Sequence, residues 1–234
     1  MKLGIFTDPH YGVLKEDLVT RRPSMSLNKL KTVVGKFKEA QVDAIICLGD
    51  WITIYPDRDV MTDCLLKMAE VAKSVNIPVY TCMGNHDGEV FSREEFKDLT
   101  DFTISPCTFE KGNKKVILLD ANYMRDGSPW PPNYDDWTET SIPKDEILWL
   151  KNQLNTEKTC FVGMHQCINP NIDSNHVMEN QEEVRGIIKE AGNVPFVIQG
   201  HYHPGEDETI DGIRYYTLRA LCEMEELNYL IYEF

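Results

Sequence analysis

Short apolar runs recur along the chain, and stretches with helical spacing separate them. The first three runs cover residues 2–7, 44–48 and 77–83, and their length and residue types are typical of buried strands. Residues 25–40 carry apolar side chains three and four positions apart, which predicts a helix with one buried face. A second helix precedes residue 77, with Asp59 as its expected N-cap. Strands and helices that alternate at this spacing predict parallel strand pairing.

The second half of the chain repeats this alternation after a less regular middle. Residues 103–110 and 115–120 are expected to form two strands joined through Gly112-Asn113, a turn typical of hairpins. Further strands are expected at 159–164, 194–199, 209–218 and 227–234, and further helices at 143–154 and 177–191. The pattern as a whole predicts an α/β fold.

A long segment, residues 123–142, shows neither helical nor strand periodicity. Connections of this length are usually functional or disordered, and the aromatic rings of Trp130, Tyr134 and Trp137 argue against disorder. Two interpretations stay open. The rings could close over a substrate or stack on a nucleobase, or they could pack the segment onto the rest of the protein.

Length and charge restrict the classes of partner. The 234 residues contain no linker, basic tract or repeat, so a single domain over residues 1–234 is expected. The 24 Lys and Arg residues against 38 Asp and Glu residues give a net charge of −14. Such a surface repels phosphate backbones, which argues against long nucleic acids and anionic membranes as partners. A small phosphorylated substrate remains compatible, because a local cation outweighs distant surface charge.

Cysteine usage and hydropathy bear on the compartment. The seven cysteines are odd in number, form no Cys-x-x-Cys pair and lie mostly within apolar patterns, which favours a reducing compartment. The chain starts with a predicted strand, and no apolar run is long enough to span a bilayer. A cytoplasmic location is therefore expected.

Side chains suited to metal binding follow five of the predicted strands. Asp8 and His10 follow the first, and His201 and His203 follow a late one; the i, i+2 spacing puts each pair on one side of an extended backbone. Five of the six histidines lie at such strand ends, where α/β sheets bind ligands. The full set is Asp8, His10, Asp50, Asn85, His86, His165, His201 and His203.

This set offers carboxylate, amide and imidazole ligands but no thiolate. It favours two divalent ions, such as manganese, iron, cobalt or zinc, over a structural zinc site built from cysteines. Taken singly, each motif could be a turn, a helix cap or a core histidine. Together they provide more ligands than one ion with an open position needs, so two ions that share a carboxylate are predicted.

The ordered motifs resemble those of the calcineurin-like metallophosphoesterase superfamily. The resemblance extends from residue 8 to residue 203 and implies a four-layer α/β/β/α sandwich with two mixed β-sheets, with the metal site at the carboxyl ends of strands. The motifs that carry it are Asp8-x-His10, Gly49-Asp50, Gly84-Asn85-His86-Asp87, His165 and Gly200-His201-x-His203.

The resemblance also implies roles for these residues. The implied ligands are Asp8, His10 and His203 for one ion and Asn85, His165 and His201 for the other, with Asp50 bridging both. His86 would be catalytic, protonating the leaving oxygen or stabilising transition-state charge. The implied reaction is in-line attack of a metal-bound hydroxide on the phosphoester of a small substrate, by a phosphodiesterase or a phosphatase. Nucleotide-like molecules are among the implied small phosphorylated substrates. The alternative is a non-catalytic metal-binding scaffold, but scaffolds tend to lose ligands and every position here is filled.

The sequence departs from the pattern of the serine/threonine phosphatases after Gly49-Asp50. Those enzymes continue with Asp-Arg-Gly, whereas Trp51 follows here and no acid stands at Thr53. The usual partner of His86 is thus unassigned, and a protein phosphatase is disfavoured. The compact length resembles the bacterial branch that includes cyclic-nucleotide and glycerophosphodiester phosphodiesterases and manganese-dependent ADP-ribose/CDP-alcohol diphosphatases.

Four residues near the motifs have competing interpretations. Arg21 and Arg22 could hold a second phosphate or a carboxylate, or could be ordinary surface arginines. His176 is expected to be a solvated or capping residue rather than a ligand, although its loop follows His165 and could border the pocket. Asp87 is expected to orient either His86 or the turn that carries it.

Overall fold

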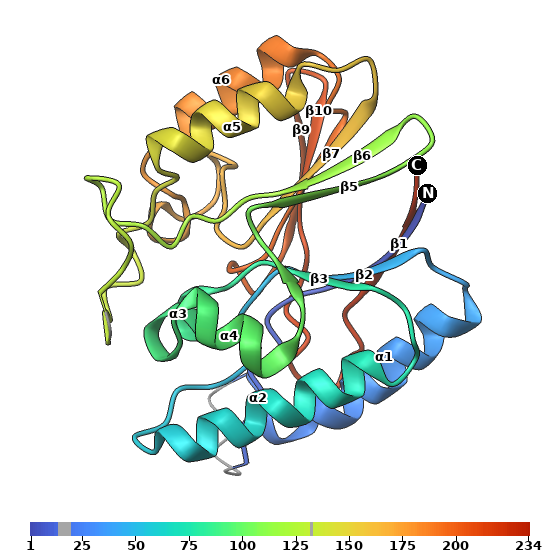
Figure 1. Ribbon diagram of the computed structural model, residues 1–234, viewed down its shortest axis with the longest axis vertical. Helices are drawn as coiled ribbons and strands as arrows, with labels where there is room; N and C mark the ends of the chain where they lie inside the picture. Colours follow the sequence, from blue (N-terminus) through green and yellow to red (C-terminus); the bar gives the residue numbers. More distant parts are fainter. Residues whose placement is uncertain (14–19, 132) are drawn as a thin grey trace.

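Two mixed β-sheets pack face to face, and helices cover the outer face of each (Figure 1). The computed structural model describes residues 1–13, 20–131 and 133–234. Between the sheets, apolar side chains from both form a shared core that includes Leu3, Ile46 and Phe161. Because strands in this position are buried on both faces, they read as continuous apolar runs in the sequence.

The first sheet contains the early strands of the chain, and the last strand pairs beside them. Its order is β11 (Leu230–Glu233), β1 (Lys2–Phe6), β2 (Ala44–Cys47), β3 (Val79–Thr81) and β4 (Thr103–Ile104). All pairs are parallel except β11 with β1. The predicted helices α1 (Ser26–Glu39) and α2 (Arg58–Lys73) cover its outer face (Figure 1).

The second sheet contains the remaining strands. Its order is β5 (Cys107–Lys111), β6 (Lys114–Leu118), β7 (Thr159–Met164), β8 (Phe196–Gln199), β10 (Ile213–Thr217) and β9 (Glu206–Ile210). The strands from β6 to β10 are parallel, and the hairpins β5–β6 and β9–β10 form the two edges. Helices α5 (Lys144–Leu154) and α6 (Gln181–Ala191) cover the outer face (Figure 1).

Three local expectations need correction. Residues 103–110 do not form one strand: β4 ends before Pro106, which has no N–H for a ladder, and β5 continues in the other sheet. The N-cap of α2 is Asp57 and not Asp59, because the Asp57 carboxylate accepts from the backbone N–H of Asp59 at 2.9 Å. Two short helices, α3 (Asn85–Val90) and α4 (Arg93–Thr100), lie between β3 and β4 where none was predicted.

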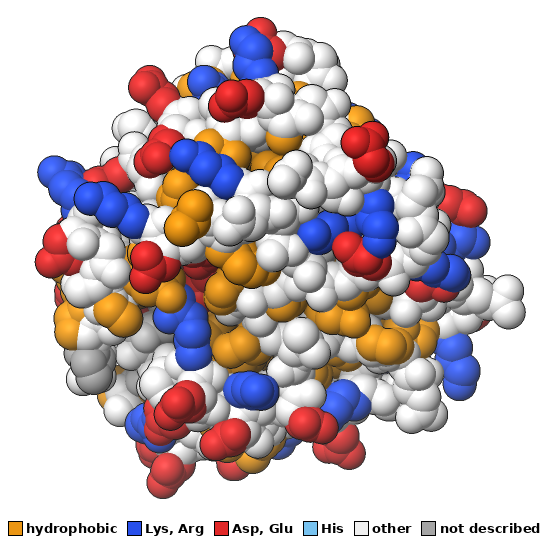
Figure 2. Space-filling view, turned by 45° about the horizontal axis from the view of Figure 1, so that its top comes forward, with side chains coloured by type: hydrophobic (Ala, Val, Ile, Leu, Met, Phe, Trp, Pro, Cys, Tyr) orange, Lys and Arg blue, Asp and Glu red, His pale blue; other side chains and the backbone are white. Residues whose placement is uncertain are grey.

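The segment 123–142 is irregular, as predicted, and contains only isolated β-bridges among its described residues. Its residue Pro132 lies outside the described part of the chain. On the face drawn in Figure 2, acidic and basic side chains are interspersed, and apolar side chains gather mainly across the middle. None of the helices in the described part of the chain has the length and hydropathy of a membrane span.

Candidate metal centre

The polar residues that follow five strands meet at one end of the two sheets. Asp8 and Asp50 come from the loops after β1 and β2 of the first sheet, and Asn85 is the first residue of α3, which follows β3. His165 and His201 come from the loops after β7 and β8 of the second sheet. All five side chains are buried. The backbone N–H of His201 donates to Asp8, so residues 193 positions apart in the sequence meet at the junction of the sheets.

One cluster of atoms forms around Asp8, His10 and His203. The Nε2 atoms of His10 and His203 lie 3.1 Å apart, and His203 Nε2 lies 3.5 Å from Asp8 Oδ1. Asp50 Oδ2 lies 3.3 Å from His10 Nε2. Asp8 Oδ1 is buried and has no hydrogen-bond partner among the described residues. A carboxylate oxygen left bare between two imidazole nitrogens fits a site for a cation.

A second cluster forms around Asn85, His165 and His201. His165 Nε2 lies 3.1 Å from Asn85 Oδ1 and 3.2 Å from His201 Nδ1. It also lies 3.4 Å from Asp50 Oδ2, the same oxygen that approaches His10. One carboxylate oxygen therefore faces both clusters, which is the arrangement that a bridging ligand requires.

Hydrogen bonds fix the side of each group that faces the clusters. Asp8 Oδ2 accepts from the Thr7 hydroxyl and, at 3.1 Å, from the backbone N–H of His201, which turns Oδ1 inward. Asp50 Oδ1 accepts from the backbone N–H of His86 at 2.9 Å, which turns Oδ2 toward His10 and His165. His165 Nδ1 lies 2.8 Å from the carbonyl oxygen of Leu48, so an N–H there leaves Nε2 with its lone pair.

The backbone at the clusters is held in unusual conformations. Asp8, His10, Asp50 and His201 have φ angles of 49°, 41°, 55° and 65°, in the left-handed region that residues with a Cβ rarely adopt. Such conformations concentrate at functional sites, where the surrounding structure over-determines them. Here they let each loop turn sharply at its strand end and direct its side chain into the space between the sheets.

His86 lies on the first turn of α3, beside the first cluster. Its ring centroid is 4.5 Å from that of His10, and its Nδ1 has no hydrogen-bond partner among the described residues. Burial lowers the pKa of His86 to about 3, although the charge of Asp50 opposes the shift. Thr53 does not replace the absent acid, because its hydroxyl donates to the carbonyl of His10 at 2.7 Å. Asp87 orients the turn, since it accepts from the backbone N–H groups of Gly84 and Trp51.

A cavity of about 230 Å³ opens beside the clusters. Besides candidate ligands it is lined by Arg21, His86, Trp137 and His176, so His176 borders the site, and Arg21 faces it rather than only the surface. The Trp137 ring lies 5.4 Å from that of His201 and 5.2 Å from that of His176. Of the aromatic residues in segment 123–142, Trp137 is thus the one at this cavity.

Trp130 and Tyr134 make hydrogen bonds within segment 123–142. Trp130 Nε1 donates to the carbonyl of Glu139, and the Tyr134 hydroxyl donates to the Glu139 carboxylate. Trp130 also borders a separate, larger cavity of about 610 Å³ next to α3 and α4. The packing interpretation therefore describes Trp130 and Tyr134 better than it describes Trp137.

Two residues beside the clusters, Asn122 and Glu223, were not predicted from the sequence. Asn122 donates through Nδ2 to the carbonyls of Met83 and Gly84, which supports the loop that carries Asn85. Its signal was its place just after β6, at a strand end like those of the predicted ligands. Glu223 Oε1 lies 2.9 Å from Nδ1 of His203 and comes from the C-terminal part of the chain, where no motif marked it.

Comparison with known proteins decides the family. The sequence matches the family model of the calcineurin-like phosphoesterases over residues 1–205. The chain belongs to this family. The resemblance inferred from its motifs is confirmed, and the protein is a metal-dependent phosphoesterase. A comparison with curated protein sequences gave no match.

Solved structures agree on the fold. A dimetal phosphatase from Danio rerio is similar with a TM-score of 0.83 at 17% identity, over 99% of this chain and 91% of that one. The protein TT1561 of Thermus thermophilus has a TM-score of 0.62 at 11% identity, over 94% and 90%. A putative 5′-nucleotidase from Staphylococcus aureus has a TM-score of 0.60 at 12% identity, over 94% and 48%. These likenesses confirm the predicted four-layer sandwich of the metallophosphoesterase.

Proposed function

We propose that this phosphoesterase is a dinuclear hydrolase that cleaves a phosphoester bond of a small substrate by in-line displacement at phosphorus. The observation that carries the proposal is the place of Asp50 Oδ2, which faces both clusters at 3.3 and 3.4 Å from their nearest histidine nitrogens. The proposed ligands are Asp8, His10 and His203 for one ion and Asn85, His165 and His201 for the other, with Asp50 shared. The proposed catalytic residue is His86.

The ligand types fit manganese, iron, cobalt or zinc. When bound, two such ions would lower the pKa of the attacking water and neutralise charge on the phosphoryl oxygens. Two divalent ions against the carboxylates of Asp8 and Asp50 leave the site cationic, which allows an acidic protein to attract a phosphorylated substrate.

The remaining chemistry belongs to side chains at the cavity. His86 is positioned at its wall, next to His10, where a neutral imidazole can stabilise charge that develops in the transition state through its N–H. Delivery of a proton to the leaving oxygen needs the protonated imidazole, which burial disfavours in the metal-free protein by lowering the pKa of His86. Arg21 lies at the same wall and supplies a fixed positive charge for an anionic substrate. A cavity of about 230 Å³ accommodates a phosphoryl group with a small substituent.

The direct test is hydrolysis of bis(p-nitrophenyl) phosphate and p-nitrophenyl phosphate. We expect metal-free protein to be inactive and added manganese, cobalt or zinc to restore turnover of at least one ester, with chelation reversing the effect. The two esters separate phosphodiesterase from phosphatase activity. If two ions bind and neither ester turns over with any of the metals, the scaffold alternative replaces the hydrolase.

His86→Ala tests the division between metal binding and catalysis. His86, His10 and Asp50 place possible ligand atoms within 4.8 Å of one another, so His86 has to be tested as a ligand as well. We expect His86→Ala to retain two ions per chain and to lose turnover by roughly 100-fold or more. His176→Ala, which removes another imidazole at the cavity, is the matched control and should lose less than about tenfold. Loss of an ion in parallel with activity would make His86 a ligand.

A further inference from the structure

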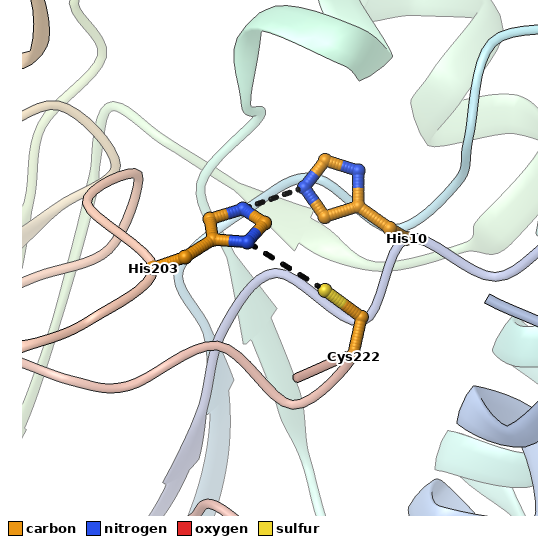
Figure 3. Close-up of side chains that lie close together, drawn as sticks. All are labelled: His10, His203 and Cys222. Atoms are coloured by element: carbon orange, nitrogen blue, oxygen red, sulfur yellow. Dashed lines mark hydrogen bonds between the residues drawn. The ribbon is translucent and has the colours of Figure 1, made fainter. Parts of the chain in front are cut away.

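The C-terminal part of the chain reaches the back of the first cluster. His203 Nε2 faces His10 and Asp8, while His203 Nδ1 faces Glu223 Oε1 at 2.9 Å. Figure 3 shows that the His203 ring presents one nitrogen to the His10 ring and the other to the Cys222 thiol. The two ring nitrogens of His203 therefore face different surroundings, one in the cluster and one outside it.

The contact with Glu223 determines which nitrogen carries the proton. A carboxylate accepts hydrogen bonds, so Glu223 favours the tautomer with N–H at Nδ1 and a lone pair at Nε2. In the described part of the chain, His165 Nδ1 faces only a neutral carbonyl, and His10 Nδ1 and His201 Nε2 have no partner. Among these four imidazoles, His203 alone has a carboxylate behind its outward-facing nitrogen.

Glu223 is firmly positioned for this contact. The buried Lys29 of α1 donates through Nζ to the backbone carbonyls of Leu221 at 2.8 Å and Glu223 at 2.9 Å. The backbone N–H of Cys222 donates to the carbonyl of Asp8 at 3.1 Å, which ties the same segment to the loop after β1. Leu221, Cys222 and Glu223 lie beyond residue 205, where the match to the family model ends.

We propose that Glu223 is a positioning residue for the metal centre. Its carboxylate fixes the Nδ1–H tautomer and the ring orientation of His203, and thereby strengthens the binding of a divalent cation at Asp8, His10 and His203. The inference rests on the ligand assignment in the proposed function. Carboxylates behind metal-binding histidines typically contribute 10- to 100-fold in metal affinity, because they orient the ring and raise its basicity.

The competing interpretation is that Cys222 itself binds a metal ion together with His10 and His203. Its Sγ lies 3.7 Å from His203 Nδ1, and with His10 and His203 it forms a group that could hold a metal ion (Figure 3). His203, however, faces the thiol with Nδ1 and faces His10 with Nε2. One ion between His10 and His203 therefore lies away from Cys222, and Cys222→Ala should leave metal binding intact.

Calorimetric titration of the metal-free protein with manganese, together with the ion content after dialysis, tests the proposal. We expect Glu223→Ala to weaken one of the two binding steps by 10- to 100-fold and to leave the other unchanged. Glu223→Gln retains a carbonyl acceptor without the charge, so it should weaken the same step by a smaller factor. The controls are Cys222→Ala and Glu225→Gln, an exposed neighbour, and both should match wild type.

A second measurement separates positioning from folding. In metal-free protein labelled with ¹⁵N-histidine, the His203 Nδ1–H resonance, assigned with His203→Ala, should shift in Glu223→Gln while the circular dichroism spectrum stays unchanged. If Glu223→Ala does not fold, the isosteric Glu223→Gln decides the question by both measurements. The proposal would be overturned if both Glu223 variants bound two manganese ions with the affinities of the wild-type protein. It would also be overturned if Cys222→Ala lost an ion.

The titration needs no substrate, so it fails or succeeds independently of the proposed function. Wild-type protein that binds two ions but hydrolyses neither ester, with one ion weakened in Glu223→Ala, would refute the hydrolase and retain the role of Glu223. Wild-type turnover with both affinities unchanged in Glu223→Ala would do the reverse.

Discussion

Close backbone approaches at individual glycines make the cluster geometry possible. A Cβ on Gly84 would lie 2.0 Å from Asp50 Oδ1, and one on Gly200 would lie 2.2 Å from the Thr7 hydroxyl oxygen and 2.8 Å from Asp8 Oδ2. These neighbours are carboxylates that face the clusters or a hydroxyl that holds one of them. The motif glycines Gly84 and Gly200 are thus required by space around the candidate ligands, in addition to any turn they help to form.

Gly84→Ala should displace the shared carboxylate. The φ of Gly84 is −86°, which any residue adopts, so the effect is steric and falls on Asp50. We expect a loss of about 1–3 kcal/mol in the free energy of unfolding and at least tenfold weaker binding of both ions. Urea unfolding and manganese titration measure the two effects.

The matched control for this prediction is Gly35→Ala. Gly35 lies in α1, and a Cβ there would meet nothing within 4 Å. Alanine should stabilise that helix by up to about 1 kcal/mol and leave metal binding unchanged. Unaltered binding of both ions in Gly84→Ala would mean that Asp50 is not held against this glycine.

The candidate site residues at strand ends could be predicted because the apolar run that precedes them is a local signal in the sequence. Asp8, His10, His201 and His203 stand at or shortly after the ends of apolar runs, which marked them in the sequence. The backbone at Asp8, His10 and His201 is left-handed rather than extended, so the i, i+2 argument does not explain how their side chains converge. Glu223 could not be predicted in this way, because it reaches His203 only through tertiary contacts of the C-terminal segment with Lys29 and Asp8. Side-chain partners that depend on such packing leave no local pattern.

At the level of elements, strongly periodic segments were predicted well and short polar ones were not. The helices α1 and α2 bury an apolar face, and their periodicity predicted them. The helices α3 and α4 have six and eight residues, mostly polar, so their pattern is too short to distinguish from a loop. The change of sheet near Pro106 also depends on tertiary pairing rather than on local preference.

The cap of α2 gives a prediction at this scale. Asp57 accepts from the N–H groups of Asp59 and Val60, whereas Asp59 lies within the first turn. We expect Asp57→Ala to lower the free energy of unfolding by about 1 kcal/mol, because it leaves N–H groups at the helix start without their acceptor. Urea unfolding measures the change.

Asp59→Ala is the control for the cap. It removes only a favourable charge near the helix N-terminus, so its cost should stay within about 0.5 kcal/mol. Equal costs for the two variants would show that the charge at the helix end, and not the capping hydrogen bonds, provides the stabilisation.

At the scale of the whole molecule, the clusters join the two sheets. The first sheet supplies Asp8 and Asp50 from loops and Asn85 from the start of α3, and loops of the second sheet supply His165 and His201. The sequence predicted this convergence because the carboxyl ends of parallel strands meet at one edge of a sheet, and the family fold places two such edges together. Without cations, the carboxylates of Asp8 and Asp50 are buried without a metal ion to balance their charge, which costs solvation free energy.

Metal ions should therefore increase the free energy of unfolding, in addition to their proposed part in the reaction. Each ion that binds only the folded protein adds about 2.7 kcal/mol at a concentration 100 times its Kd. For a chain of this length, two ions should raise Tm by roughly 10–20 °C, as measured by thermal unfolding across a manganese titration. Asp50→Asn replaces the charged carboxylate that faces both clusters with a neutral amide, so this variant should lose most of the rise in Tm. Glu225→Gln changes an exposed residue and should keep the full rise. A Tm that stays constant while two ions bind would mean that the ions do not depend on the junction between the sheets.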